Sequence, residues 1–161
     1  MKVIDNFLED EFLLKKMQSV ILGKEFTWIY TDEVSSPWDK SGFLFCHPMF
    51  FTEKGQESKF YDLMFPLLGR LKFNNILRIK VNAYTKTHEN IKHGFHRDFP
   101  HDHKVALFSL NTNNGGTEFK NGEFYNSVEN RLLMFDGLEE HRSVTQTDTI
   151  LIHQKKFLVL I

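Results

Sequence analysis

The chain has 161 residues, which is about one domain, because domains commonly span roughly 100–200 residues. A hydrophobic fraction of 41% and a charged fraction of 25% are ordinary for a soluble globular protein, and the 17 phenylalanines favour a β core. A net charge of −1 provides no overall field that would attract nucleic acid or an anionic membrane. We therefore expect a single domain over residues 1–161 that recruits neither through its overall charge; a local basic groove stays open as an alternative.

The single cysteine, Cys46, cannot form an internal disulfide, which fits a reducing compartment. Residues 1–12 carry acidic side chains from the fifth position and no long apolar run, so we expect no secretory signal peptide. No stretch approaches the ~20 apolar residues of a membrane-spanning helix. These features predict a cytoplasmic protein.

The N-terminal part of the chain predicts two helical segments. A short extended piece leads to Asp5 or Asn6 as a candidate cap, and Gly23 is a natural stop. Between them, apolar residues recur at helical spacing: Phe12, Leu13, Met17 and Ile21. Residues 58–71, "SKFYDLMFPLLGRL", are amphipathic too, and Pro66 predicts a kink or a break between two short helices.

From residue 74 onward the pattern becomes that of strands. Residues 76–84, "ILRIKVNAY", alternate apolar and polar side chains as a half-buried strand does. Asn121-Gly122 in "TEFKNGEFY" predicts a tight hairpin. Further strand signals follow in "KVALFSLN", "NRLLMFDG", "HRSVTQT" and "KKFLVLI". Helices followed by many strands predict an α+β fold, a β sandwich or barrel with helices on one face.

A metal site is suggested by "KHGFHRDFPHDHK", residues 92–104. His96 and Asp98 are two residues apart, and in extended backbone such side chains point to the same side. His141, at the start of a predicted strand, is the best candidate for a third ligand. Two imidazoles and one carboxylate form the facial triad that suits non-haem Fe(II) and leaves coordination positions open.

Two other interpretations of this stretch remain open. A histidine-rich loop is often only solvated surface, because a short His-x-Asp motif also arises by chance. A zinc site is the other alternative, although it lacks a clear partner strand; it would use His101, Asp102 and His103, or His93.

Three stretches in a fixed order carry a resemblance to a known family. They are "NAYTKTHENIKHGFHRDFP", "VALFSLNTNNGGTEF" and "NRLLMFDGLEEHRSV", and the opening "VIDNFLEDEF" adds to them. Together they resemble the 2-oxoglutarate- and Fe(II)-dependent dioxygenases, and within these the prolyl-4-hydroxylase-like branch. The resemblance covers nearly the whole chain, and the ordered set is far more specific than any single motif.

The resemblance implies a double-stranded β-helix (jelly roll) with supporting N-terminal helices. It assigns the metal ligands to His96, Asp98 and His141. Tyr84 matches a tyrosine that lines the cosubstrate pocket, although a packed aromatic at a strand end is the alternative. Gly115-Gly116 matches a tight turn before a strand, where the absence of side chains lets the backbone fold closely.

The chain departs from the family pattern near its C-terminus. The family has an arginine or lysine on the final strand, which pairs with the far carboxylate of 2-oxoglutarate. In the family this basic residue follows the distal histidine by nine or ten positions. Counted from His141, these positions hold Ile150 and Leu151, which cannot bind a carboxylate. Lys155 or Lys156 would take the role after a longer loop, with an ammonium in place of the bidentate guanidinium. The alternative is two solvated lysines at a strand start.

The implied activity is that of an oxygenase. With Fe(II), 2-oxoglutarate and dioxygen it would hydroxylate an unactivated C–H bond of a peptidyl or small-molecule substrate, releasing succinate and CO2. Two alternatives stay open: a metal-binding jelly-roll module that has lost 2-oxoglutarate turnover, and a cupin-type metalloenzyme independent of 2-oxoglutarate.

A lid over the pocket is one further hypothesis. Residues 30–47, "YTDEVSSPWDKSGFLFCH", contain Tyr30 and Trp38, and Trp28 lies just before them. Loops that carry function often cover a site in this way. A surface loop with core aromatics is the alternative.

Overall fold

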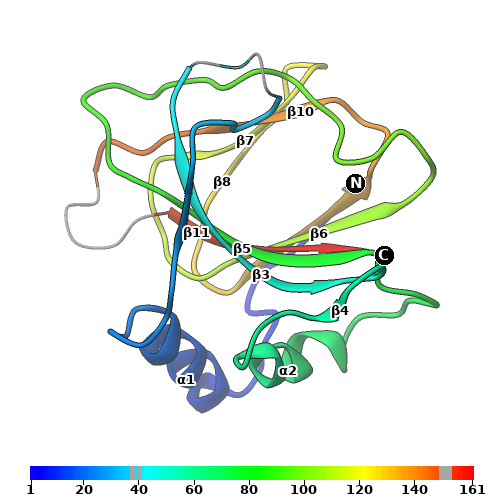
Figure 1. Cartoon of the computed structure of the whole chain (residues 1–161). Helices are drawn as coiled ribbons and strands as arrows, with labels where there is room; N and C mark the ends of the chain where they lie inside the picture. The colour runs from blue at the N-terminus through cyan, green and yellow to red at the C-terminus, as the bar shows by residue number, and fades with distance from the viewer. Residues whose placement is uncertain (37–38, 40, 149–153) are drawn as a thin grey trace.

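Two antiparallel sheets and a few helices make up the fold (Figure 1). The computed structural model describes residues 1–36, 39, 41–148 and 154–161, with residues 154–160 described by their backbone alone. The helices cover one face of the large sheet, and the small sheet lies across its other face (Figure 1). The sequence predicts an α+β fold, and the structure is mostly β-sheet with few helices, so the β part of that prediction is confirmed.

The large sheet has eight strands, all paired antiparallel. In spatial order these are β1 (Lys2–Ile4), β9 (Arg131–Asp136), β6 (Lys104–Ser109), β11 (Gln154–Leu160), β5 (Arg78–Tyr84), β3 (Leu44–Phe51) and β2 (Ile29–Thr31), with β4 (Gly55–Gln56) paired to β3. The small sheet runs in the order β10 (His141–Val144), β7 (Gly116–Phe119) and β8 (Phe124–Asn126).

Strand β5 lies inside the large sheet, hydrogen-bonded to β11 on one side and β3 on the other. Its alternation was predicted from the sequence. Ile79 and Val81 are fully buried in the core with the helices. Lys80, Asn82 and Tyr84 occupy the intervening positions and therefore face the small sheet. The period-two pattern of this strand separates a core face from a pocket face.

Helix α1 (Glu11–Ile21) confirms the first predicted helix. The Asp10 carboxylate caps it by accepting a hydrogen bond from the backbone N–H of Phe12, so neither Asp5 nor Asn6 is the cap. Its apolar face buries Leu14, Met17 and Ile21 against the large sheet. Exposed Phe12, at 73%, lies outside that face although its spacing suggested otherwise.

The second amphipathic segment divides at Pro66, as predicted. A 3-10 turn, η1 (Tyr61–Met64), is followed by a single α turn, α2 (Phe65–Leu68), with the proline at the start of α2. The expected set of supporting N-terminal helices is therefore not supported, because α1 is the one helix of several turns among the described residues. None of the helices described is both long and apolar enough to cross a membrane.

The predicted hairpin joins β7 to β8. The backbone N–H of Phe119 donates to the Glu123 carbonyl at 2.9 Å, and that of Gly122 donates to the Phe119 carbonyl at 2.9 Å. Gly122 has a φ of +93°, a conformation that side-chain-bearing residues rarely adopt. Before β7, a Cβ on Gly115 would lie 2.7 Å from the carbonyl oxygen of Val144, which explains the tight glycine turn.

Candidate metal centre

His96, Asp98 and His141 come together between the two sheets. One ligand atom from each lies within 4.8 Å of the others, and this is the one such group of three or more among the described residues. His141 begins β10, and its backbone pairs with that of His96 through hydrogen bonds of 3.0 and 3.1 Å. The structure thus brings together the three residues that the sequence singled out.

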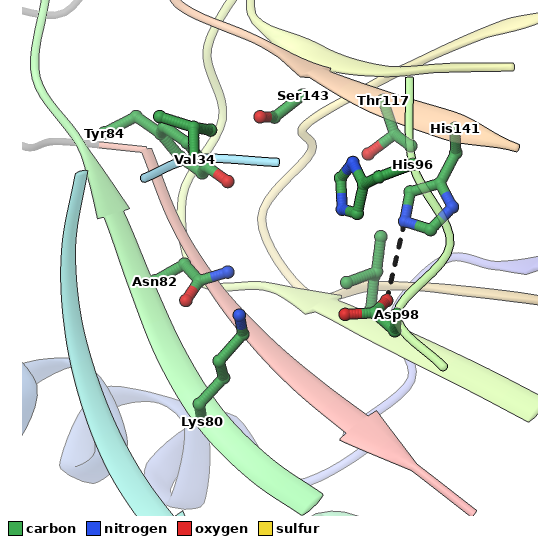
Figure 2. Close-up of a pocket in the computed structure, with 10 residues that line it drawn as sticks. Val34, Lys80, Asn82, Tyr84, His96, Asp98, Thr117, His141 and Ser143 are labelled. Atoms are coloured by element: carbon green, nitrogen blue, oxygen red, sulfur yellow. Dashed lines mark ion pairs between the residues drawn. The ribbon is translucent and has the colours of Figure 1, made fainter. Parts of the chain in front are cut away.

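Backbone carbonyls set the orientation of both imidazoles. Nδ1 of His141 donates to the Glu139 carbonyl at 3.0 Å, and Nδ1 of His96 donates to the Gly94 carbonyl at 3.3 Å. With a proton on Nδ1, each ring carries its lone pair on Nε2, the tautomer in which histidine binds a metal. The two ring centroids are 4.7 Å apart, and Nε2 of His141 faces Oδ2 of Asp98 at 3.6 Å (Figure 2).

The two carboxylate oxygens of Asp98 have different surroundings. Oδ1 accepts a hydrogen bond from Nη2 of Arg78, a residue of β5. Oδ2 is buried and accepts no hydrogen bond from the residues described. A buried carboxylate oxygen without a donor is costly unless something binds it. Its position beside two imidazoles fits a divalent cation, so the residues present suit the metal that the resemblance implied.

The charge states of these ligands also suit a cation. Burial alone would raise the pKa of Asp98, but the positive charges of Lys80 and Arg78, with smaller contributions from His141 and His96, hold that pKa below its usual range. Burial lowers the pKa of His96, partly opposed by the charge of Asp98. An ionised carboxylate and a neutral imidazole are the forms in which these side chains ligate metals.

A pocket opens beside the triad (Figure 2). Strand β5 contributes one wall, β7 and β10 contribute polar side chains from the small sheet, and the loop after β2 contributes one apolar side chain. Besides the triad the lining residues are Val34, Lys80, Asn82, Tyr84, Leu107, Thr117 and Ser143.

Tyr84 lines this pocket, as the sequence suggested. Burial raises the pKa of its phenol to about 12, although hydrogen bonds with Ser143 and Asn82 oppose the rise. The hydroxyl is therefore protonated at neutral pH and available as a donor. The side-chain oxygen of Asn82 is buried without a hydrogen-bond partner among the described residues. At least one hydrogen-bonding group next to the triad, the Asn82 side-chain oxygen, is thus not used by the described residues.

The loop after β2 is fastened to the segment that carries the triad. Asp39 accepts hydrogen bonds from the hydroxyls of Ser35 and Ser41, and from the backbone N–H of Gly94 at 2.8 Å. Gly94 lies two residues before His96. The loop therefore places Val34 against the pocket through a carboxylate anchor.

The other histidines of the motif lie outside the triad. His93 is buried, and its Nδ1 contacts the hydroxyl of Ser143 at 2.8 Å. The rings of His101 and His103 lie against Phe99. Among the described residues, none of these histidines joins a group of potential ligands, so the alternative zinc set is not assembled.

The predicted anchor lysines lie on β11. In the strand register Lys156 is opposite Asn82 and Lys155 is opposite Ala83. Their side chains are outside what the structure describes, as are Ile150 and Leu151 altogether. The role of Lys155 or Lys156 therefore stays a prediction.

Two of the three aromatic side chains named for the lid, Trp28 and Tyr30, lie outside the pocket lining. Tyr30 is 59% exposed and contacts Phe43 and Phe45, while Trp28 packs on Phe26 in the core. Trp38 lies outside the described residues.

Sequence reasoning did not identify Arg78, Lys80 and Asn82 as site residues. A usable signal was present, because Lys80 and Asn82 lie four and two positions before Tyr84 on a predicted strand and so share its face. Asp39 gave no such signal, since its link to Gly94 depends on how an irregular loop folds back.

Known structures share this fold, although no protein-family model and no curated protein matches the chain. A 2OG-Fe(II) oxygenase family oxidoreductase from Burkholderia pseudomallei superposes with a TM-score of 0.69 at 10% identity, covering 98% of this chain and 83% of that one. A Pseudomonas putida prolyl-4-hydroxylase gives 0.60 at 10% identity, over 99% and 90% of the two chains.

A third solved structure is a prolyl hydroxylase from Trichoplax adhaerens, in complex with a peptide fragment of the hypoxia-inducible factor oxygen degradation domain. It gives a TM-score of 0.60 at 13% identity over 99% of this chain and 81% of that one. The chain has the fold of the prolyl hydroxylases. The predicted resemblance is confirmed at this level, and His96, Asp98 and His141 form a group that can bind iron.

Proposed function

We propose that the protein is a non-haem Fe(II)- and 2-oxoglutarate-dependent oxygenase that hydroxylates a C–H bond of a peptidyl or small-molecule substrate. The observation that carries this proposal is the grouping of His96, Asp98 and His141, in which Oδ2 of Asp98 accepts no hydrogen bond from the described residues. The fold shared with prolyl hydroxylases supports it. A single double-stranded β-helix domain spanning residues 1–161, and a cytoplasmic location, belong to the same proposal.

Within this proposal the metal would be held by Nε2 of both histidines and Oδ2 of Asp98. Bound Fe(II) and 2-oxoglutarate would supply the oxidising power, with dioxygen as the second cosubstrate. The chain contributes geometry and charge. Arg78 holds Asp98 by its other oxygen, which leaves one oxygen for the cation and keeps the carboxylate in a fixed orientation. Leu107 and Val34 add apolar surface to the pocket lining.

The substrate class is proposed from likeness only. The Trichoplax structure is a complex with a peptide fragment, which makes a peptidyl substrate one candidate for this chain. The exposed Arg97, between two of the ligands, is a candidate substrate contact. Arg142 instead binds Glu118 at 3.2 Å and stacks on Phe95, so its charge is already paired.

Anaerobic loading with Fe(II) followed by titration with 2-oxoglutarate tests the proposal. We expect a saturable visible charge-transfer band in the native protein and none in His141→Ala, because two ligands bind the metal weakly. Replacing the exposed His101 by alanine is the matched control and should leave the band unchanged. Iron binding without any 2-oxoglutarate-dependent band would favour the metal-binding module without turnover.

A further inference from the structure

The far end of the cosubstrate needs a cation. Resting on the proposed function, 2-oxoglutarate would use its keto group and adjacent carboxylate at the metal, which leaves its second carboxylate two methylenes away. A carboxylate that enters a buried pocket loses its hydration and requires charged or hydrogen-bonding partners there. At the spacing where the family places a basic residue, this chain has Ile150 and Leu151.

Lys80 supplies a cation inside the pocket. It is half-buried on β5, lines the same pocket as the triad, and extends from the strand into the space between the sheets (Figure 2). Its ammonium makes no hydrogen bond or ion pair with the residues that the structure describes. Among the described pocket-lining residues Lys80 is the one lysine or arginine, and Asp98 is the one carboxylate.

The local charges leave Lys80 in need of an anion. Asp98 is already paired with the guanidinium of Arg78. The single negative charge of Asp98 is therefore shared between two nearby cations, Arg78 and Lys80. Burial lowers the pKa of Lys80, and the positive charge of Arg78 lowers it further, while Asp98 raises it. A divalent metal at the triad would add positive charge, and an incoming dianion would offset this excess.

The neighbours of Lys80 also suit a carboxylate. Lys80, Asn82 and Tyr84 occupy alternate positions of β5 and line one wall of the pocket. The phenol of Tyr84 stays protonated and can donate, and the amide of Asn82, which already hydrogen-bonds Tyr84, still carries an N–H donor. A cation flanked by neutral donors on one rigid strand is a preorganised carboxylate site.

We propose that Lys80 binds the far carboxylate of 2-oxoglutarate, in place of a basic residue on the final strand. Lys156 is the natural comparator. It lies on the adjacent strand β11 opposite Asn82, and it is one of the two anchors, with Lys155, that the sequence suggested. The two assignments differ in the strand that supplies the charge.

Two ligands and two variants distinguish these assignments. Fe(II)-loaded native protein, Lys80→Met and Lys156→Met are titrated anaerobically with 2-oxoglutarate and with 2-oxopentanoate, which has a methyl group where the far carboxylate would be. Calorimetry and the charge-transfer band report binding without turnover. We expect Lys80→Met to weaken 2-oxoglutarate binding by about 10- to 100-fold, the usual effect of a charged hydrogen bond. Its affinity for 2-oxopentanoate should not change.

The binding of 2-oxopentanoate by Lys80→Met also shows that this variant folds and keeps its metal site. Lys80→Arg, which retains the charge, should recover part of the affinity for 2-oxoglutarate. Equal affinity of Lys80→Met and native protein for 2-oxoglutarate would overturn the proposal, as would an equal or larger loss in Lys156→Met. Native protein that binds iron but neither oxo acid would instead overturn the proposed function, and the assignment with it.

Discussion

The unequal environment of its two oxygens is the most informative feature of Asp98. Arg78 takes Oδ1, and Oδ2 is left beside His141 at 3.6 Å. Arg78 is itself held in place, because its guanidinium lies over the Phe99 ring, 5.0 Å from the centroid. Partners of this kind orient a ligand and raise metal affinity although they never touch the metal. The arrangement makes Arg78 a positioning residue.

Replacing Arg78 by methionine should lower the affinity for Fe(II) or Co(II) by about 10- to 100-fold, because the carboxylate loses its fixed orientation. Calorimetric metal titration measures this. Arg131→Met is the matched control, since Arg131 also binds a carboxylate, Asp5, but belongs to neither the triad nor the pocket lining. The control should bind metal like the native protein. A similar loss in both variants would mean that Arg78 acts only through stability.

At the scale of elements, the sequence predicted best those strands and turns whose signal lies in residues adjacent along the chain. The alternation in residues 76–84 identified β5, and Asn121-Gly122 identified the β7–β8 turn, because both signals depend on neighbours in sequence. Strand β3 was not predicted. It contains Pro48, and its pairing with β5 shifts register between Pro48 and Phe50, so its alternation is broken.

The site was predicted in the same uneven way. His96, Asp98 and His141 follow from a motif and its order along the chain. The importance of Lys80 could not be read in the same manner, because it depends on which strands flank β5 and on the pairing of Asp98 with Arg78. The charge balance around Lys80 depends on contacts between segments that are distant in sequence. Such contacts cannot be read from one sequence alone.

The loop after β2 depends on one carboxylate. Because hydrogen bonds lower the pKa of Asp39 despite its burial, its folded pKa lies below the unfolded value. Its contribution is therefore complete above the unfolded pKa and disappears as the pH falls through the folded one. Asp39→Asn should cost about 1–3 kcal/mol at pH 7, with a difference from native protein that shrinks below about pH 4.

Urea unfolding at a series of pH values measures that difference. The exposed Asp102, replaced by asparagine, is the control and should show no comparable loss at pH 7. A gap between native protein and Asp39→Asn that is as large near pH 2 as at pH 7 would contradict the assigned role of the Asp39 charge.

For the whole molecule, the triad ties together parts of the chain that are distant in sequence. His96 and Asp98 belong to the long connection between β5 and β6 of the large sheet, whereas His141 belongs to β10 of the small sheet (Figure 1). Two backbone hydrogen bonds between His96 and His141 already join these parts. A metal bound to all three ligands would bind the folded arrangement and not the unfolded chain.

Metal binding should therefore raise the thermal stability of the protein. A free metal concentration of one hundred times Kd stabilises the folded state by about 2.7 kcal/mol. For a chain of this length that corresponds to a rise in Tm of about 5–10 °C. Anaerobic thermal unfolding with Fe(II) or with a chelator measures the shift. His141→Ala should lose it, while His101→Ala should keep it, because the metal links the two sheets only through His141. A full shift in His141→Ala would place the metal elsewhere.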